Sequence, residues 1–189
     1  MLTPKNVIIQ KATIWTCGPE GVITNGSIRI ANGRIVEVSR KLSPPESFDG
    51  IIIGAKGMHV TPGLIDCHSH SMILGGVNEG TLPSTAMVRI GDVVNSETGN
   101  IYRQLAGGLT TANLLHGSAN PIGGQNQVIK LRHGAPPDGL KFAKAPPGIK
   151  FALGENVKQS NWGDDKTTRF PQTRMGVKTF FNNRFTAAR

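Results

Sequence analysis

The sequence predicts an α/β protein in which a small antiparallel β unit precedes alternating strands and helices. Two observations support this prediction. Residues 27–39 alternate apolar and polar side chains on both sides of Asn32-Gly33, a pair typical of a β-hairpin turn. After residue 60, short apolar stretches alternate with helical ones, which favours a parallel α/β sheet. We therefore expect two parts, residues 1–60 and residues 61–189.

The first part contains further strand signals around this hairpin. Residues 6–15 are rich in β-branched side chains and predict a strand. Pro44-Pro45 interrupts the stretch 41–50, which we expect to be a loop, and residues 51–55 predict a further short strand.

The second part begins with a short apolar strand at residues 63–66. A helix is expected over 97–106, with Ser96 as its N-cap and Gly107-Gly108 at its end. The remaining expected segments are strands at 109–117 and 149–154, a Gly/Pro loop at 118–125, a strand or extended segment at 126–134 and a turn-rich linker at 135–148.

A helix is also expected at residues 174–188. Val177, Phe181 and Phe185 recur at every fourth position there, which places them on one helix face.

The composition excludes several classes of protein. With 38% hydrophobic and 17% charged residues, the chain is not a disordered polyelectrolyte. It has no apolar run of about 18 residues, so we expect no transmembrane helix and no membrane partner. Lys5 and Lys11 interrupt the apolar N-terminus, which therefore does not resemble a signal peptide. Two cysteines make no disulfide framework, so a reduced, cytoplasmic protein is expected.

The net charge of +9 is carried by the second half of the chain. Residues 1–100 hold eight basic and eight acidic side chains, whereas residues 101–189 hold 13 basic and four acidic ones. Such asymmetry is one indication of nucleic-acid binding. The basic residues are scattered, however, aromatic residues make up only 5%, and no recognition motif is present, so we expect no nucleic-acid partner.

The chemically informative motif is His68-x-His70, directly after the apolar strand. The two-residue period of a strand places both imidazoles on one face, with Asp66 one step earlier on that face. Imidazole nitrogens at this spacing can converge on one divalent metal ion, and imidazole suits zinc, iron, nickel and cobalt. A bare His-x-His pair is more often a pair of surface side chains, so the surrounding residues matter.

Those surroundings, Val60-Thr61-Pro62-Gly63-Leu64-Ile65-Asp66-Cys67-His68-Ser69-His70, resemble the amidohydrolase superfamily. The resemblance implies a small N-terminal β-sandwich portion over residues 1–60, followed over 61–189 by the first part of a (β/α)8 barrel. Residues 103–133, 150–158 and 173–176 further resemble the imidazolonepropionase-like branch of that superfamily.

The resemblance also implies a metal site and its chemistry. Members hydrolyse C–N bonds of amides, cyclic amides or imides with water activated by one or two divalent metal ions, commonly zinc. His68 and His70 would be ligands. A third ligand, a Glu or a carboxylated Lys, would come from a mid-barrel strand. Glu155, at the end of an expected strand, is the main candidate and Lys150 and Lys158 are alternatives; Glu155 could instead be an exposed loop acid or a helix cap.

Two further residues are candidates with open alternatives. Asp66 could orient a metal-binding histidine, or it could bond local backbone. His116 could face a small amide-type substrate, or it could be an ordinary polar side chain of a loop.

The length departs from the family pattern. A (β/α)8 barrel needs about 250 residues, and 129 follow residue 60. We therefore expect an incomplete barrel, with the general-base Asp beyond the C-terminus. Its partner would be a missing C-terminal half or a second chain. The parent protein is expected to be a homo-oligomer. On this interpretation, the positive charge reflects where the chain stops.

Three functions follow from these expectations. The first is a metal-dependent amidohydrolase that acts on C–N bonds, with this chain as its N-terminal part and inactive alone. A deaminase of the same superfamily is its nearest variant. The alternative class is a catalytically inactive scaffold or fragment with the same fold.

Overall fold

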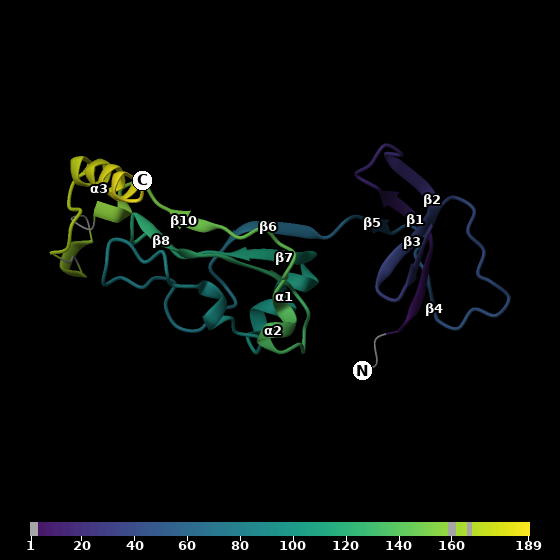
Figure 1. Cartoon of the computed structure of the whole chain (residues 1–189). Helices are drawn as coiled ribbons and strands as arrows, with labels where there is room; N and C mark the ends of the chain where they lie inside the picture. Colours follow the sequence, from purple (N-terminus) through teal and green to yellow (C-terminus); the bar gives the residue numbers. More distant parts are fainter. Residues whose placement is uncertain (1–3, 159–161, 166–167) are drawn as a thin grey trace. The chain divides into compact units, whose positions relative to one another are not determined.

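The computed structural model describes residues 4–158, 162–165 and 168–189. The chain divides into two compact units, Met1–Pro62 and Gly63–Arg189 (Figure 1). None of the helices in the described part combines the length and the apolar character that crossing a bilayer requires.

The first unit is one mixed sheet with strand order β3-β2-β1-β4, in which β5 also pairs with β1. The expected hairpin is confirmed: β2 and β3 pair in antiparallel fashion, and Asn32 and Gly33 both have positive φ (50° and 72°). The five strands are β1 (Asn6–Trp15), β2 (Val22–Ala31), β3 (Arg34–Ser39), β4 (Ile51–Gly54) and β5 (His59–Val60).

The expectation of a purely antiparallel first unit is wrong. Strands β4 and β5 both run parallel to β1. The loop after β3 is too long for a hairpin and brings the chain to the free edge of β1, where it runs in the same direction as β1. The core of this unit consists of Ala12, Ile14, Ile23, Ile28 and Ala55.

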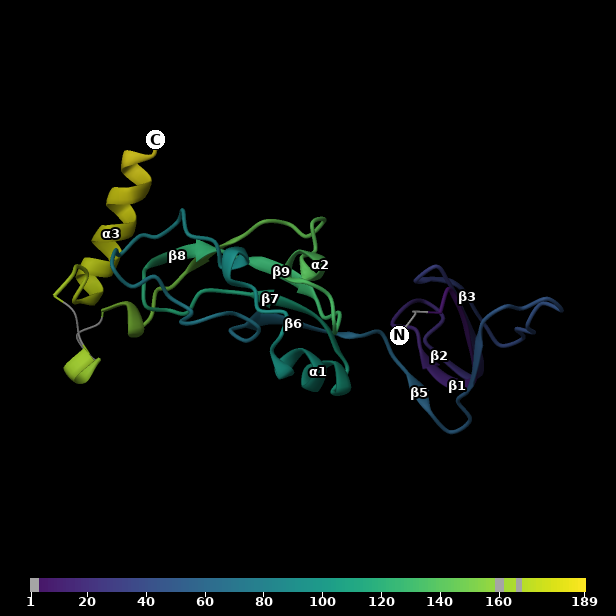
Figure 2. The same cartoon turned by 90° about the horizontal axis from the view of Figure 1, so that it is seen from below.

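The second unit contains two small sheets, of order β6-β7-β9 and β10-β8. Strands β6 and β7 are parallel and α1 connects them, which makes a βαβ unit that both views show (Figures 1 and 2). The strands are β6 (Leu64–Ser69), β7 (Leu109–Leu114), β8 (Ile122–Gln125), β9 (Gln127–Lys130) and β10 (Ile149–Phe151). The helices are α1 (Gly99–Ala106), α2 (Pro137–Leu140) and α3 (Arg174–Ala187), with short 3-10 turns at Ile90–Val93, Asn156–Lys158 and Gly163–Asp165.

Only part of this unit has the expected parallel arrangement. Strand β7 pairs with β9, and β8 with β10, in antiparallel fashion. No helix separates β7 from β9, so the chain returns along its neighbour in the opposite direction. The described residues form mixed α/β structure with several small sheets, and no closed barrel occurs among them.

The prediction of a loop over 118–125 is also wrong for its last four residues, because β8 occupies residues 122–125. Glycine usually weakens a strand, which is why the composition predicted a loop. Here Gly123 and Gly124 are buried, and a Cβ at Gly124 would lie 2.3 Å from His116 Nε2. Glycine is therefore the residue that allows this strand to pack against the imidazole.

Both expected helices form, with differences in detail. Helix α1 begins at Gly99 and is capped by Thr98, not Ser96, because the Thr98 hydroxyl accepts a hydrogen bond from the Asn100 N–H (3.3 Å). Helix α3 buries Gly176, Val177 and Phe180. Phe185 is 57% exposed, so the helix face that Val177, Phe181 and Phe185 share is only partly buried.

The main core of the second unit lies between α1 and the β6-β7-β9 sheet. Ile101 of α1, Leu114 of β7 and Ile129 of β9 are completely buried in it. This packing holds the carboxyl ends of β6 and β7 side by side, where His70 and His116 follow.

Candidate metal site

Strand β6 presents two histidines whose rings converge. His68 lies in the strand and His70 directly follows it, and their Nε2 atoms are 3.1 Å apart. The ring centroids are 4.9 Å apart and the rings are nearly perpendicular. Parallel pairing of Ser69 with Leu114 of β7 anchors the backbone between them. The structure therefore brings the two predicted ligands together.

A backbone carbonyl determines the form of the second imidazole. His70 Nδ1 lies 2.8 Å from the carbonyl oxygen of Leu115. A carbonyl oxygen can only accept, so Nδ1 carries the hydrogen and donates it. In neutral His70 the lone pair then lies on Nε2, the atom that faces His68.

Lys150 on β10 approaches the same place from the other sheet. Its Nζ is 3.3 Å from His68 Nε2. The positive charge of Lys150 is the largest cause that lowers the pKa of His68, followed by partial burial and by His70, while Asp66 opposes them. A neutral His68 has one lone pair on Nε2, which accepts from Lys150 in this arrangement, and a metal ion bound by His68 and His70 would take that lone pair in place of the ammonium hydrogen.

Asp66 contacts the backbone instead of an imidazole nitrogen. Its Oδ1 accepts a hydrogen bond from the His68 N–H (3.0 Å). This is the local alternative that the sequence analysis left open, and it fixes the backbone of the strand at His68.

Glu155 lies elsewhere, in a group of ion pairs. It accepts from Arg174 Nε at 3.0 Å and pairs with Lys158 Nζ at 2.5 Å. The hydrogen bonds from Lys158 and Arg174 hold the pKa of its carboxyl below the ordinary value. Within residues 4–158, 162–165 and 168–189, no group of three His, Cys, Asp or Glu side chains is arranged to hold a metal ion. Of the three candidates for the third ligand, Lys150 is the one that contacts His68.

His116 is buried beside this site. Its exposed fraction is 3%, it follows β7 by two residues, and its Nε2 has no hydrogen-bond partner in the described structure. Burial lowers the pKa of His116. This effect outweighs that of the carbonyl groups of Val77, Val88 and Gln125, which raise the pKa. The ring lines a cavity of about 170 Å³ together with Asn78, Glu79 and Arg89. A role in substrate binding stays a prediction.

Two asparagines that the sequence analysis did not single out also contribute to the site. Asn113 on β7 donates to the Cys67 carbonyl (3.3 Å) and accepts from Asn126 (2.7 Å). Neither residue has a local sequence signal, because their role depends on which strands lie side by side.

Comparison with known proteins shows several relatives. No family model matches the chain. It is 32% identical to the amidohydrolase tasK of Hapsidospora irregularis, over 97% of this chain and 22% of that protein. It is 43% identical to a 5-methylthioadenosine/S-adenosylhomocysteine deaminase of Pelotomaculum thermopropionicum, over 35% of this chain and 16% of that protein. An imidazolonepropionase of Acidiphilium cryptum is 35% identical over 38% of this chain and 18% of its own length.

The chain is also similar to a solved structure over nearly its whole length. An amidohydrolase from Thermotoga maritima aligns with a TM-score of 0.81 and 32% identity, over 96% of this chain and 47% of that one. The chain thus spans about a fifth of the length of the curated relatives and about half of this structure.

Proposed function

The chain belongs to the amidohydrolase superfamily, and we propose that it carries the metal-binding part of a site that hydrolyses C–N bonds of amides, cyclic amides or imides. The observation that carries this proposal is the convergence of His68 Nε2 and His70 Nε2, 3.1 Å apart, beside Lys150.

The residues present fit a divalent transition metal ion such as zinc. Two imidazole nitrogens face each other, and the backbone carbonyl of Leu115 directs the lone pair of His70 to that place. This arrangement agrees with the metal-ligating histidines of other proteins, which usually donate their second ring N–H to a fixed acceptor. The third donor would be Lys150, as a carbamate formed when Nζ loses its ammonium proton, adds CO2 and releases a second proton.

A metal ion at this place would supply Lewis acidity, which lowers the pKa of a water molecule and polarises the substrate carbonyl. The chain's own residues would do the positioning. Leu115 holds the His70 ring, Asp66 holds the backbone of His68, and His116 offers an unpaired Nε2 to a polar group of the substrate. Since burial keeps His116 neutral, it can bind as a donor or an acceptor according to its tautomer.

We also propose that β6, α1 and β7 form the first βαβ unit of a (β/α)8 barrel. The general-base Asp and further barrel strands would then come from additional polypeptide, either in the same chain or in a second one. Support comes from the match to only 47% of the Thermotoga maritima structure.

Metal analysis tests the proposal. The purified chain, loaded with Zn²⁺ and desalted, is expected to retain bound zinc measured by mass spectrometry. The variants His68→Ala and His70→Ala should lose it, and Lys150→Ala should weaken it. His133→Ala is the matched control, because His133 is an exposed histidine outside the site. Equal zinc retention by the control and by His68→Ala would overturn the proposal.

Deamination is the second candidate, because the chain is similar to a deaminase over 68 aligned residues at 43% identity. Both reactions would use the same metal-activated water. Release of ammonium from an amidine-type substrate, without hydrolysis of cyclic amides, would favour deamination. Zinc retention without either reaction in any complemented form would favour the inactive scaffold.

A further inference from the structure

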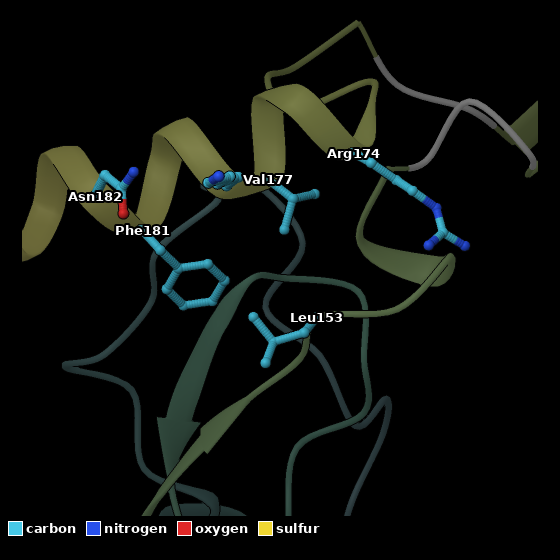
Figure 3. Close-up of a pocket in the computed structure, with 6 residues that line it drawn as sticks. Leu153, Arg174, Val177, Phe181 and Asn182 are labelled. Atoms are coloured by element: carbon cyan, nitrogen blue, oxygen red, sulfur yellow. The ribbon is translucent and has the colours of Figure 1, made fainter.

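Helix α3 leaves an apolar groove open on the surface of the second unit. The groove is a cavity of about 310 Å³ lined by Leu153, Arg174, Val177, Lys178, Phe181 and Asn182. Figure 3 shows Val177 and Phe181 pointing from the helix toward Leu153, with Arg174 at one end and Asn182 at the other.

The apolar surface extends beyond the groove itself. Leu153 is 72% exposed, Phe151 41% and Phe185 57%. The ring of Phe151 contacts those of Phe181 and Phe185, with centroid distances of 5.9 and 6.2 Å. Large side chains that expose this much surface in one place are typical of a binding site.

All charged side chains of helix α3, which lines the groove, are positive. Between Arg174 and Ala187, α3 contains two arginines and one lysine and no acidic residue. Arg174 pairs with Glu155, which also pairs with Lys158, whereas Lys178 makes no ion pair within the described part of the chain. Among the residues that the structure describes, Lys178 is therefore a cation without an ion-pair partner, at the edge of the apolar groove.

We propose that this groove binds an amphipathic polypeptide segment that places apolar side chains against Leu153 and Phe181 and a carboxylate against Lys178. An acidic amphipathic segment would match both the apolar groove and the cation of Lys178 at its edge. This proposal does not depend on the metal site.

Other occupants fit the groove less well. A second copy of this chain would bring the same basic α3, and the like charges of the two helices oppose association. A lipid surface could contact the exposed Leu153 but could not fill the groove down to Val177, which is only 5% exposed. A nucleic acid would not use the apolar surface of Leu153, Val177 and Phe181.

Fluorescence anisotropy of labelled synthetic peptides tests the proposal. The probe is a helical peptide of about 16 residues with Leu at positions i, i+3, i+4 and i+7 and Glu on both flanks. The control peptides replace every Glu with Lys or scramble the same residues. We expect the acidic peptide to bind more tightly than both controls, and less tightly as NaCl rises from 50 to 300 mM.

Paired variants locate the binding. Leu153→Asp is expected to weaken the acidic peptide about tenfold, and Lys178→Glu about fivefold. Their controls are Met175→Asp, which changes an α3 side chain that is 77% exposed outside the groove, and Lys144→Glu, an exposed lysine elsewhere. Circular dichroism should show that all four variants keep the fold.

Several outcomes would overturn the proposal. These are equal binding of the Glu and Lys peptides, equal effects of Leu153→Asp and Met175→Asp, or failure of the acidic peptide to bind at all. Binding to vesicles that contain phosphatidylserine without binding to the peptide would assign the surface to lipid. Self-association in sedimentation experiments that Leu153→Asp abolishes would assign it to a second copy.

Discussion

Asn126 and Asn113 are joined by a side-chain hydrogen bond of 2.7 Å, in which Asn126 Nδ2 donates to Asn113 Oδ1. Asn113 in turn donates to the carbonyl of Cys67, the residue before His68 (3.3 Å). The pair therefore fixes the position of the strand that carries the proposed ligands.

The other side of Asn126 is bonded to the segment that leads to Lys150. The N–H of Gly148 donates to Asn126 Oδ1 (2.6 Å), and the N–H of Asn126 donates to the Gly148 carbonyl (3.0 Å). Asn126 thus couples the strands of His68 and Lys150, although it touches neither side chain.

Replacing this asparagine should weaken both the fold and metal binding. Asn126→Ala leaves Asn113 Oδ1 and the Gly148 N–H without their partner, at a cost of about 1–3 kcal/mol in the free energy of unfolding. Urea unfolding measures that cost. Equilibrium dialysis against Zn²⁺ should show weaker binding in addition, because His68 and Lys150 lose their fixed separation.

Two further variants separate positioning from stability. Asn126→Asp retains the acceptor for Gly148 and should restore part of the zinc affinity. Ile129→Val in β9 removes one buried methylene for about 1 kcal/mol without touching these hydrogen bonds. If Ile129→Val weakened zinc binding as much as Asn126→Ala, the positioning role would be wrong.

The glycines of β8 give a second prediction. A Cβ at Gly124 would lie 2.3 Å from both His116 Nε2 and the Val88 carbonyl oxygen, whereas one at Gly123 would meet the side chains of His116 and Lys150 at 3.3 Å. Gly124→Ala should therefore lower the free energy of unfolding by about 2 kcal/mol or more, and Gly123→Ala by clearly less. Thermal unfolding measures both, and equal effects would contradict the packing of His116 on Gly124.

The local patterns predicted those parts of the structure that depend on neighbouring residues. Strand periodicity placed His68 and His70 on one face, and Asn32-Gly33 predicted the hairpin, because each depends on a few consecutive residues. The strand at Gly123-Gly124 was not predicted, because its glycines serve to pack against His116. Only the tertiary structure brings His116 to this strand.

The third candidate ligand shows the same limit. Glu155 ends an expected strand, but Arg174, 19 residues later, binds its carboxylate. Lys150 reaches His68 because β10 pairs with β8. Lys150 and His68 are 82 positions apart in sequence. No local pattern encodes such a contact, so the sequence could only name the three candidates.

A helix cap gives a third prediction. Thr173 has an extended backbone, and its hydroxyl accepts a hydrogen bond from the Gly176 N–H (3.0 Å) at the start of α3. Thr173→Ala should lower the free energy of unfolding by about 1 kcal/mol. Thr179→Ala, at an exposed position within the same helix, should change it by less than about 0.5 kcal/mol. Urea unfolding followed by circular dichroism compares the two, and a larger effect at Thr179 would contradict the cap.

His116 should make the stability of the chain depend on pH. Burial lowers its pKa in the folded state below the ordinary value of 6.5, so the unfolded chain binds the proton more readily. The contribution of neutral His116 is therefore fully present above about pH 6.5 and is lost as the pH falls through that value. The slope from this one group is at most about 1.4 kcal/mol per pH unit.

Urea unfolding at pH 7.5, 6.5 and 5.5 tests this dependence by comparing the native chain with His116→Gln. The two proteins differ only at residue 116, so the difference between the two curves isolates His116. The native chain should lose more stability toward pH 5.5 than the variant does. His133→Gln replaces an exposed histidine and should follow the native curve. Parallel curves for the native chain and His116→Gln would mean that His116 is protonated as easily in the folded state as in the unfolded one.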